Sequence, residues 1–439
     1  MATLLMVESW LRSTGHSLPP LIRRLGHDYV LLTTNPALYP DTTSGLRHPV
    51  RANASEIVRA DTNDPDAAVT AARAVAARRR IDGVLTTCDF YLPTVATIAD
   101  ALGLPGARPD VLHTATRKHR VRQAMDDAGV SNVGFAVADT YDAARDAAAR
   151  LGYPLVAKPV DLNSGTAVQR VDDDAALKDA FHEITAEERN TRGQPRERVM
   201  LLEQLAEGPE VSVEAITRDG ETTIVGITDK SLAGPPAFVE SGHMFPADLP
   251  ASAVADAEAY VLDALAALDY RHGLSHTELR LTADGPRLIE INPRQAGGYI
   301  FDLLRLVTGV HPLEQLVRLS LGQPPRVHET TDVASAAVFF VISPRPGTVV
   351  GVAGTSALDA DPDVVRWQLS VPARAGLPRS NDAYLGHVVV SSASPADARA
   401  KAEAAVGSLR LRFADGTHAQ PLGVPAAHAP GGRRQRVLF

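Results

Sequence analysis

Two carboxylates, an amide and an arginine lie close together on two neighbouring runs of strand-forming residues. Glu278 is on the first run, Glu290 and Asn292 are on the second, and Arg294 follows two residues later. The residues between the runs, TADGP, predict a hairpin turn. Because alternate residues of a strand share a face, Glu290 and Asn292 lie together and Glu278 can lie across from them.

Oxygen ligands of this kind suit Mg²⁺, which proteins usually hold with a few oxygens plus substrate phosphates. Arg294 extends the same side and could neutralise a transferring phosphoryl group. The alternative is a hairpin with a solvated polar face, which an isolated Glu-x-Asn would usually be. The four residues together favour a magnesium site at a phosphate.

Two lysines and a small polar loop could also contact phosphates. Lys158 interrupts the apolar run LVA, and an ammonium in a buried strand needs a partner, which a phosphate would supply. Lys118 lies on a predicted helix beside other basic residues, where a solvated basic face is the alternative. The loop that follows Lys158 could close backbone N–H groups over phosphates, although most such loops are simple turns. Its residues are Asn163, Ser164, Gly165 and Thr166.

A further apolar run ends in a carboxylate. Glu203 follows two leucines, and the chain then passes through Gly208 to Glu210. A strand that continues as an interdomain segment can present its backbone and Glu203 to the edge of an adenine ring. Glu210 could accept hydrogen bonds from ribose hydroxyls.

The elements that must position these residues fall into about three domains. Residues 1–112 alternate short apolar runs with helical patterns, which predicts a doubly wound parallel sheet. Residues 113–322 carry the motifs above and include a charged segment, Glu183 to Arg198, that we expect to be an exposed excursion. Residues 323–439 predict a small α+β domain with a Pro/Gly/Arg-rich tail from Ala426 that is expected to be mobile.

The composition is that of a soluble globular protein. The 439 residues are 45% hydrophobic and 22% charged, and 52 acidic against 44 basic side chains give a net charge of −8. No general attraction for nucleic acid is expected from this charge. The one cysteine, Cys88, excludes an intrachain disulfide, favours a reducing compartment and is expected to be structural. No run approaches the ~20 apolar residues of a membrane helix. We expect a cytoplasmic protein, and the sequence leaves a homodimer open.

In this order the motifs resemble the ATP-grasp superfamily from about Lys118 to Arg294, with a matching N-terminal sheet domain. The resemblance implies an ATP-grasp architecture with ATP between two subdomains, and ATP and Mg²⁺, or Mn²⁺, as cofactors. For the nucleotide, the resemblance implies that Lys118 and Lys158 contact the ATP phosphates, that Glu203 and Leu205 bind adenine, and that Glu210 binds ribose. It implies that the phosphate-covering loop consists of Asn163, Ser164, Gly165 and Thr166. The implied metal ligands are Glu278, Glu290 and Asn292, and Arg294 is implied to contact the phosphoryl group. The loop has one glycine, Gly165, where members often have several, so its closure is expected to differ.

A narrower resemblance lies in Lys230 and in residues 238–246, FVESGHMFP. This segment is similar to the Glu-x-x-His-x-x-Pro stretch of the L-amino acid ligases of the bacilysin type, which make dipeptides. The resemblance implies that Glu240 supports metal and substrate and that His243 lines the amino-acid pocket. An ordinary surface histidine is the alternative for His243.

Together the resemblances imply a carboxylate–amine ligase that activates an amino acid as an acyl phosphate and releases ADP and phosphate. Arg294, Lys158, Glu240 and His243 are the expected catalytic residues, and either Glu240 or His243 could accept the proton of the amine. The small-molecule substrates are then a carboxylate and an amine, with amino acids expected. Two alternatives stay open: an ATP-grasp carboxylase-type enzyme that uses bicarbonate, and a catalytically silent nucleotide-binding module.

Overall fold

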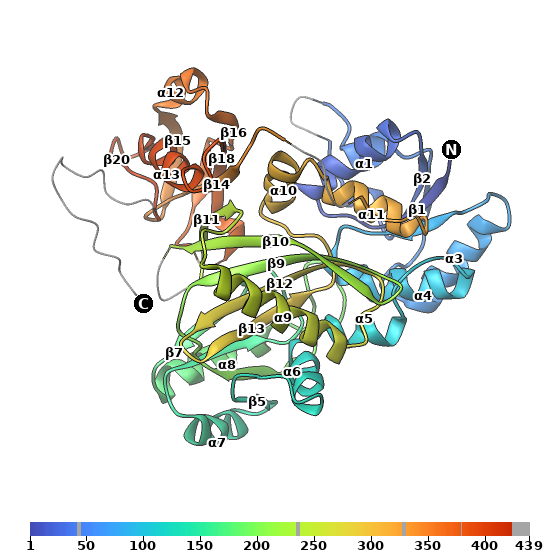
Figure 1. Cartoon of the computed structure of the whole chain (residues 1–439), viewed down its shortest axis with the longest axis horizontal. Coiled ribbons are helices and arrows are strands. Elements are labelled where there is room, and N and C mark those ends of the chain that lie inside the picture. The colour runs from blue at the N-terminus through green and yellow to red at the C-terminus, as the bar shows by residue number, and fades with distance from the viewer. Residues whose placement is uncertain (42–44, 234–237, 327–330, 379, 424–439) are drawn as a thin grey trace.

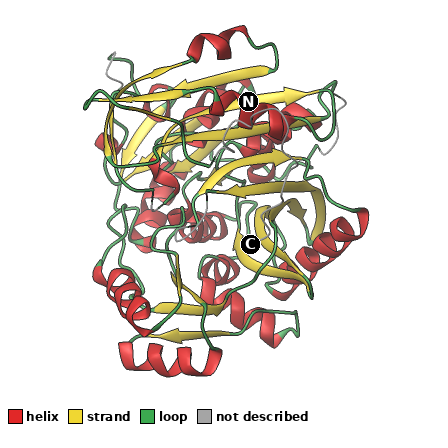
Figure 2. Cartoon of the chain, turned by 90° about the vertical axis from the view of Figure 1, so that its left-hand side faces the viewer, coloured by secondary structure: helices red, strands yellow, loops and turns green. Residues whose placement is uncertain are grey.

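The computed structural model describes residues 1–41, 45–233, 238–326, 331–378 and 380–423. Figure 1 shows the N-terminal part, a central region of long strands, a small sheet below it and a C-terminal part on the opposite side from the N-terminus. Figure 2 shows helices beside the strands in every part of the molecule. The tail expected to be mobile, from Ala426 onward, lies outside the described residues.

The N-terminal sheet is parallel, as predicted. Its order is β3-β2-β1-β4, formed by β1 (Thr3–Val7), β2 (Asp28–Thr33), β3 (Glu56–Arg59) and β4 (Gly83–Leu85). Alternate residues of β1 face opposite layers: Leu4 and Met6 pack against α1 (Thr14–Arg24), whereas Leu5 and Val7 pack against α3 (Pro65–Ala76) and α4 (Leu92–Leu102). Helices therefore cover both faces, which confirms the doubly wound arrangement.

A small antiparallel sheet forms the 135–204 subdomain, with order β5-β8-β6-β7. Its elements are β5 (Phe135–Ala138), α7 (Tyr141–Leu151), β6 (Leu155–Pro159), β7 (Gln169–Val171), α8 (Asp174–Ala186) and β8 (Met200–Gln204). Leu155, Ala157 and Leu202 face the two helices in an apolar core. Strand alternation therefore turns Lys158 and Glu203 to the other face.

The largest sheet has eight antiparallel strands in the order β13-β12-β9-β10-β11-β14-β18-β16. They are β9 (Glu210–Arg218), β10 (Glu221–Leu232), β11 (Glu240–Phe245), β12 (Gly273–Thr282), β13 (Gly285–Asn292), β14 (Ser335–Ile342), β16 (Val364–Leu369) and β18 (Tyr384–Ser392). Because β14 pairs with β11, the sheet runs without interruption across the predicted domain boundary at residue 323.

The remaining elements cover these sheets or connect them. They are α2 (Pro49–Ala52), α5 (Pro109–Ala115), α6 (Lys118–Asp127), α9 (Ala251–Ala267), α10 (Ile300–Thr308), α11 (Pro312–Ser320), α12 (Thr355–Ala360), α13 (Ala398–Gly407), and a second C-terminal sheet of β15 (Gly347–Ala353), β17 (Ala373–Ala375), β19 (Arg410–Phe413) and β20 (His418–Ala419). Helix α11 returns to the N-terminal sheet, where Leu313 and Val317 join the core of β1 and α1. Among the described residues, no helix is both long and apolar enough to cross a membrane.

One surface prediction holds only in part. The segment Glu183 to Arg198 is not simply exposed: helix α8 continues to Ala186, and Arg192 is only 8% exposed because it docks on the N-terminal domain. The solvated basic face, which was the alternative for the helix of Lys118, is only partly solvated, since Arg122 on α6 is buried at 1% exposure. Both arginines find acceptors that lie far away in the sequence.

Candidate functional site

The predicted site residues converge on one cavity of about 820 Å³ between the 135–204 subdomain, the large sheet and the N-terminal domain. Those that line it are Lys118, Lys158, Asn163, Ser164, Gly165, Glu203, Leu205, Glu210, Glu240, His243, Glu278, Glu290 and Arg294. Asn292 lines an adjoining cavity of about 230 Å³, which shares Lys118, Glu290 and Arg294 with the large one. Thr166 is exposed and lines neither cavity.

The predicted metal ligands lie together on the β12–β13 hairpin. Glu278 and Glu290 are register partners across the two strands, and the Asn292 Nδ2 donates to Glu290 Oε1 at 2.9 Å. Burial disfavours the charged form of both carboxylates, yet Lys230 and His276 hold the pKa of Glu278 at about 2. The pKa of Glu290 is likewise lowered because Lys118 outweighs burial. Two ionised, opposed carboxylates beside an amide oxygen fit a hard divalent cation.

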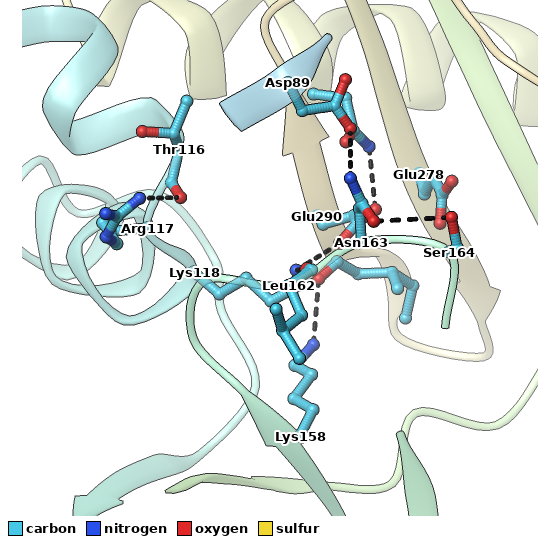
Figure 3. A network of polar contacts seen from close by, with 12 residues as sticks. Asp89, Thr116, Arg117, Lys118, Lys158, Leu162, Asn163, Ser164, Glu278 and Glu290 are labelled. Atoms are coloured by element: carbon cyan, nitrogen blue, oxygen red, sulfur yellow. Dashed lines mark hydrogen bonds and ion pairs between the residues drawn. The ribbon is translucent and has the colours of Figure 1, made fainter. Parts of the chain in front are cut away.

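Lys118 and the polar loop meet the predicted metal ligands (Figure 3). The Lys118 ammonium lies 2.9 Å from Glu290 Oε2 and donates to the Leu162 carbonyl at 2.6 Å. The Asn163 amide donates to Asp89 Oδ2 at 3.0 Å, so the loop after β6 is tied to the N-terminal domain. Lys118 therefore links the start of that loop to the carboxylate on β13.

Asp89 is a site residue that the sequence reasoning missed. It follows β4 at the carboxyl edge of the parallel sheet, where ligands of such sheets usually bind, and this position is the signal that could have found it. Its carboxylate pairs with the Arg294 guanidinium, which also donates to Asn292 Oδ1 at 3.3 Å. Burial opposes the charge on Arg294, but Asp89 outweighs it and raises the pKa of Arg294.

Lys158 and Glu203 form a buried ion pair, with Lys158 Nζ 2.7 Å from Glu203 Oε2. The missed Arg122 completes the group, because its Nε donates to Glu203 Oε1 at 2.7 Å. Burial lowers the pKa of Lys158, although Glu203 opposes this. The pKa of Glu203 is lowered because Arg122 and Lys158 together outweigh its own burial. Lys158 is thus held in the cavity wall by a carboxylate, where the sequence had suggested only a phosphate.

Lys230 stands at the centre of three carboxylates that come from three other strands of the large sheet. Its Nζ lies 2.7 Å from Glu240 Oε1, 2.7 Å from Glu278 Oε1 and 3.4 Å from Glu210 Oε1. These carboxylate oxygens all lie within 4.8 Å of one another. Burial would lower the pKa of Lys230, but Glu240 and the other carboxylates raise it well above the ordinary value. The sequence singled out Lys230 without giving it a role.

His243 is buried, so it is not the surface histidine kept as an alternative. Its Nε2 lies 3.2 Å from Glu240 Oε2, and its ring meets Phe340 edge-on at 5.6 Å between centroids. Gly298 covers the same ring nitrogen closely, since a Cβ there would lie 2.7 Å from it. Residues three apart on a regular strand face opposite sides, but the register shift between β10 and β11 at Ser231 and Leu232 places Glu240 and His243 together at the cavity wall.

Comparison with known proteins identifies the class of this fold and site. Three family models match successive parts of the chain: an ATP-grasp N-terminal domain over residues 22–106, an ATP-grasp domain over residues 151–302, and an L-amino acid ligase C-terminal domain over residues 339–414. The first two models give the chain an ATP-grasp domain preceded by an ATP-grasp N-terminal domain. By the third model, the chain resembles the L-amino acid ligases.

Individual relatives agree with this placement. An uncharacterized protein of Sinorhizobium fredii, y4rH, is 28% identical over 92% of this chain and 82% of its own length. Alanine–anticapsin ligase of Bacillus subtilis is 25% identical over 54% of this chain, and carnosine synthase 1 of Gallus gallus is 29% identical over 56%. The chain covers only 53% and 28% of the lengths of these two relatives. The L-amino acid ligase from Bacillus licheniformis shares the fold, with a TM-score of 0.77, 23% identity and coverage of 94% of this chain and 99% of that one.

Proposed function

We propose that this chain is an ATP-dependent ligase that joins an amino-acid carboxylate to the amine of a second amino acid through an acyl phosphate. The observation that supports it best is that one cavity holds both the residues predicted for ATP and metal and the Glu240–His243 pair. Two of the named relatives, alanine–anticapsin ligase and carnosine synthase 1, are consistent with two amino-acid-like substrates.

The proposed reaction has two steps. A carboxylate oxygen attacks the γ-phosphorus of ATP, the bond to ADP breaks, and an acyl phosphate forms. The amine nitrogen then attacks the acyl carbon, phosphate leaves with the former carboxylate oxygen, and the nitrogen loses a proton. Activation is needed because a carboxylate would otherwise have to expel an oxide.

The charges of the cavity suit the first step, in which two anions must approach. We assign Mg²⁺, or Mn²⁺, to Glu278, Glu290 and Asn292, and this cation would neutralise charge on the phosphates. Arg294 and Lys158 place positive charge at the transferring group, where each such contact is typically worth about 2–4 kcal/mol. For ATP itself we assign phosphates to Lys118 and Lys158, the covering loop to Asn163, Ser164, Gly165 and Thr166, adenine to Glu203 and Leu205, and ribose to Glu210.

The second step needs a proton acceptor, and the two candidates differ in their surroundings. Burial favours the neutral form of Glu240, but Lys230 and His243 hold its pKa far below the ordinary value, which makes it a weak base. We therefore assign the proton of the amine to His243, with Glu240 stabilising the imidazolium at 3.2 Å.

The test is ADP release on mixing the protein with ATP, Mg²⁺ and pools of amino acids, with mass detection of the condensed product. We expect ADP and an amide to form together, and only when two amino acids are present. ADP release that requires bicarbonate instead would replace this proposal with the carboxylase type. Nucleotide binding without ADP release under any condition would favour the silent module.

A further inference from the structure

A loop of the 135–204 subdomain is fastened to the N-terminal domain. We name residues 187–199, between α8 and β8, the clasp loop. Within it, the Arg192 guanidinium donates to the Ser9 carbonyl at 2.7 Å and lies 5.4 Å from the centroid of the Trp10 ring. The Asn63 side chain donates back to the Arg192 carbonyl at 2.9 Å. These contacts join segments more than 120 residues apart in the sequence, and the charged side chain of Arg192 is buried where they meet.

The tip of the clasp loop is organised by its own hydrogen bonds. The Asn190 Oδ1 accepts from the backbone N–H groups of Arg192 at 2.9 Å and Gln194 at 3.1 Å. Gly193 has a φ of +79°, a left-handed conformation that a glycine adopts without strain. The Gln194 side chain then donates to the Phe90 carbonyl at 3.1 Å. The loop therefore presents a defined tip to the N-terminal domain.

The residues that the clasp loop contacts lie next to residues assigned to the reaction. Trp10 lines the large cavity, and Phe90 directly follows Asp89, the partner of Arg294. Asn190 and Gln194 themselves line the smaller cavity together with Asn292. At its other end the clasp loop leads directly into β8, which carries Glu203. The clasp loop thus spans from Glu203, assigned to adenine, to the smaller cavity beside Asn292 and Arg294, assigned to the metal and the phosphoryl group.

We propose that Arg192 is a positioning residue that holds the clasp loop closed over the smaller cavity and so keeps water from the acyl phosphate. This inference rests on the proposed ligase function. In the unwanted reaction, water attacks the acyl phosphate, phosphate leaves, and the free carboxylate and a proton are regenerated, so that ATP is consumed without an amide. Closed sites suppress such side reactions by excluding water. Arg192 touches none of the reacting groups and acts through the Trp10 ring, while Gln194 of the same loop contacts Phe90.

The direct test is the number of ADP molecules released per amide formed by Arg192→Ala. Loss of a charged hydrogen bond and of the ring contact shifts the closed–open equilibrium by about tenfold. We expect the ratio of ADP to amide to rise at least about threefold, with the KM for ATP changed by less than about twofold. Arg198→Ala is the matched control, because Arg198 lies in the same loop and donates to Thr185 within its own subdomain at 2.7 Å.

An unchanged ratio in a folded Arg192→Ala protein, or an equal rise in Arg198→Ala, would overturn the proposal. Asn63→Ala approaches the same contact from the N-terminal domain, and it serves if Arg192→Ala does not fold. Asn63→Ala should also raise the ratio of ADP to amide. The double variant should show no further rise, because both changes remove the same attachment of the clasp loop.

Hydrogen–deuterium exchange tests the clasp independently of the reaction. The backbone amides of residues 187–199 should exchange faster in Arg192→Ala than in the wild-type protein, while those of α7 stay unchanged. Equal exchange in the two proteins rejects the clasp even if an amide forms. If the wild-type protein makes no amide from any amino-acid pool, the proposed function fails, and the exchange measurement still decides whether Arg192 fastens the loop.

Discussion

Arg122 is a buried charge whose hydrogen bonds connect several of the elements that carry the site. Its guanidinium donates to Glu203, to the Asn132 side chain and to the Leu288 carbonyl, at 2.7, 3.0 and 2.7 Å. It therefore connects the 135–204 subdomain, helix α6 and strand β13. Lys158 shares the same carboxylate but lines the large cavity, whereas Arg122 lines the smaller one, so the two cations should differ in what they contribute.

The first prediction separates these two contributions. Lys158→Met leaves Glu203 paired with Arg122, so the free energy of unfolding should fall by only about 1–2 kcal/mol, while ATP affinity is lost. Arg122→Met leaves several buried acceptors without their donor and should cost about 3–5 kcal/mol. Urea unfolding and nucleotide-binding calorimetry measure both effects. Unchanged ATP affinity in Lys158→Met would make Lys158 purely structural.

The second prediction concerns the proposed metal ligand Glu290. Glu290→Gln keeps the volume but removes the charge, so kcat should fall by about 100-fold or more. The melting temperature should move by only a few degrees, because Lys118 keeps the Leu162 carbonyl as an acceptor. Glu221→Gln, an exposed change at the start of β10, is the control. Near-normal turnover in Glu290→Gln would remove the metal assignment.

Within the large sheet, adjacent strands each carry one charged side chain that reaches the same point. Strands β9, β10, β11 and β12 supply Glu210, Lys230, Glu240 and Glu278. The sequence allowed the β12–β13 hairpin to be predicted, because strand alternation and the turn are local patterns. It could not predict that Lys230 would meet three carboxylates, since strand order in an antiparallel sheet does not follow sequence order here.

The third prediction concerns the start of helix α11. The His311 Nδ1 accepts from the Leu313 N–H at 3.3 Å, and burial lowers the pKa of His311 from 6.5 to about 4. Between these two pH values His311 is more protonated in the unfolded chain than in the folded one. Its contribution to the free energy of unfolding is therefore fully present above pH 6.5 and is lost as the pH falls towards 4. At about pH 5, protonation of this histidine in the unfolded chain should lower the free energy of unfolding by about 1–2 kcal/mol.

The matched variant is His311→Asn, which keeps an acceptor at the helix start and cannot titrate. Urea unfolding at neutral and mildly acidic pH should show a shallower loss of stability in this variant than in the wild-type protein. Parallel losses in the two proteins would mean that His311 does not control the acid sensitivity.

At the scale of the whole molecule, the contacts that complete the site join distant parts of the chain. Asp89 on the N-terminal domain pairs with Arg294, and Arg192 of the clasp loop reaches Ser9. The order of motifs along the sequence was sufficient for the ATP-grasp architecture, which the family models and the fold confirm. These long-range partners were not predictable, because no local pattern of residues 183–198 distinguishes a docked loop from a solvated one.

If an amino-acid carboxylate is activated by phosphoryl transfer, oxygen-18 placed in that carboxylate must appear in the released phosphate. The labelled amino acid, an acceptor amino acid, ATP and Mg²⁺ are incubated with the protein, and the inorganic phosphate is analysed by mass spectrometry. In an acyl phosphate the bridging oxygen comes from the carboxylate and leaves with phosphate. We therefore expect one oxygen-18 atom in each phosphate released with an amide. Amide formation with unlabelled phosphate, or with the label in AMP, would contradict activation by phosphoryl transfer.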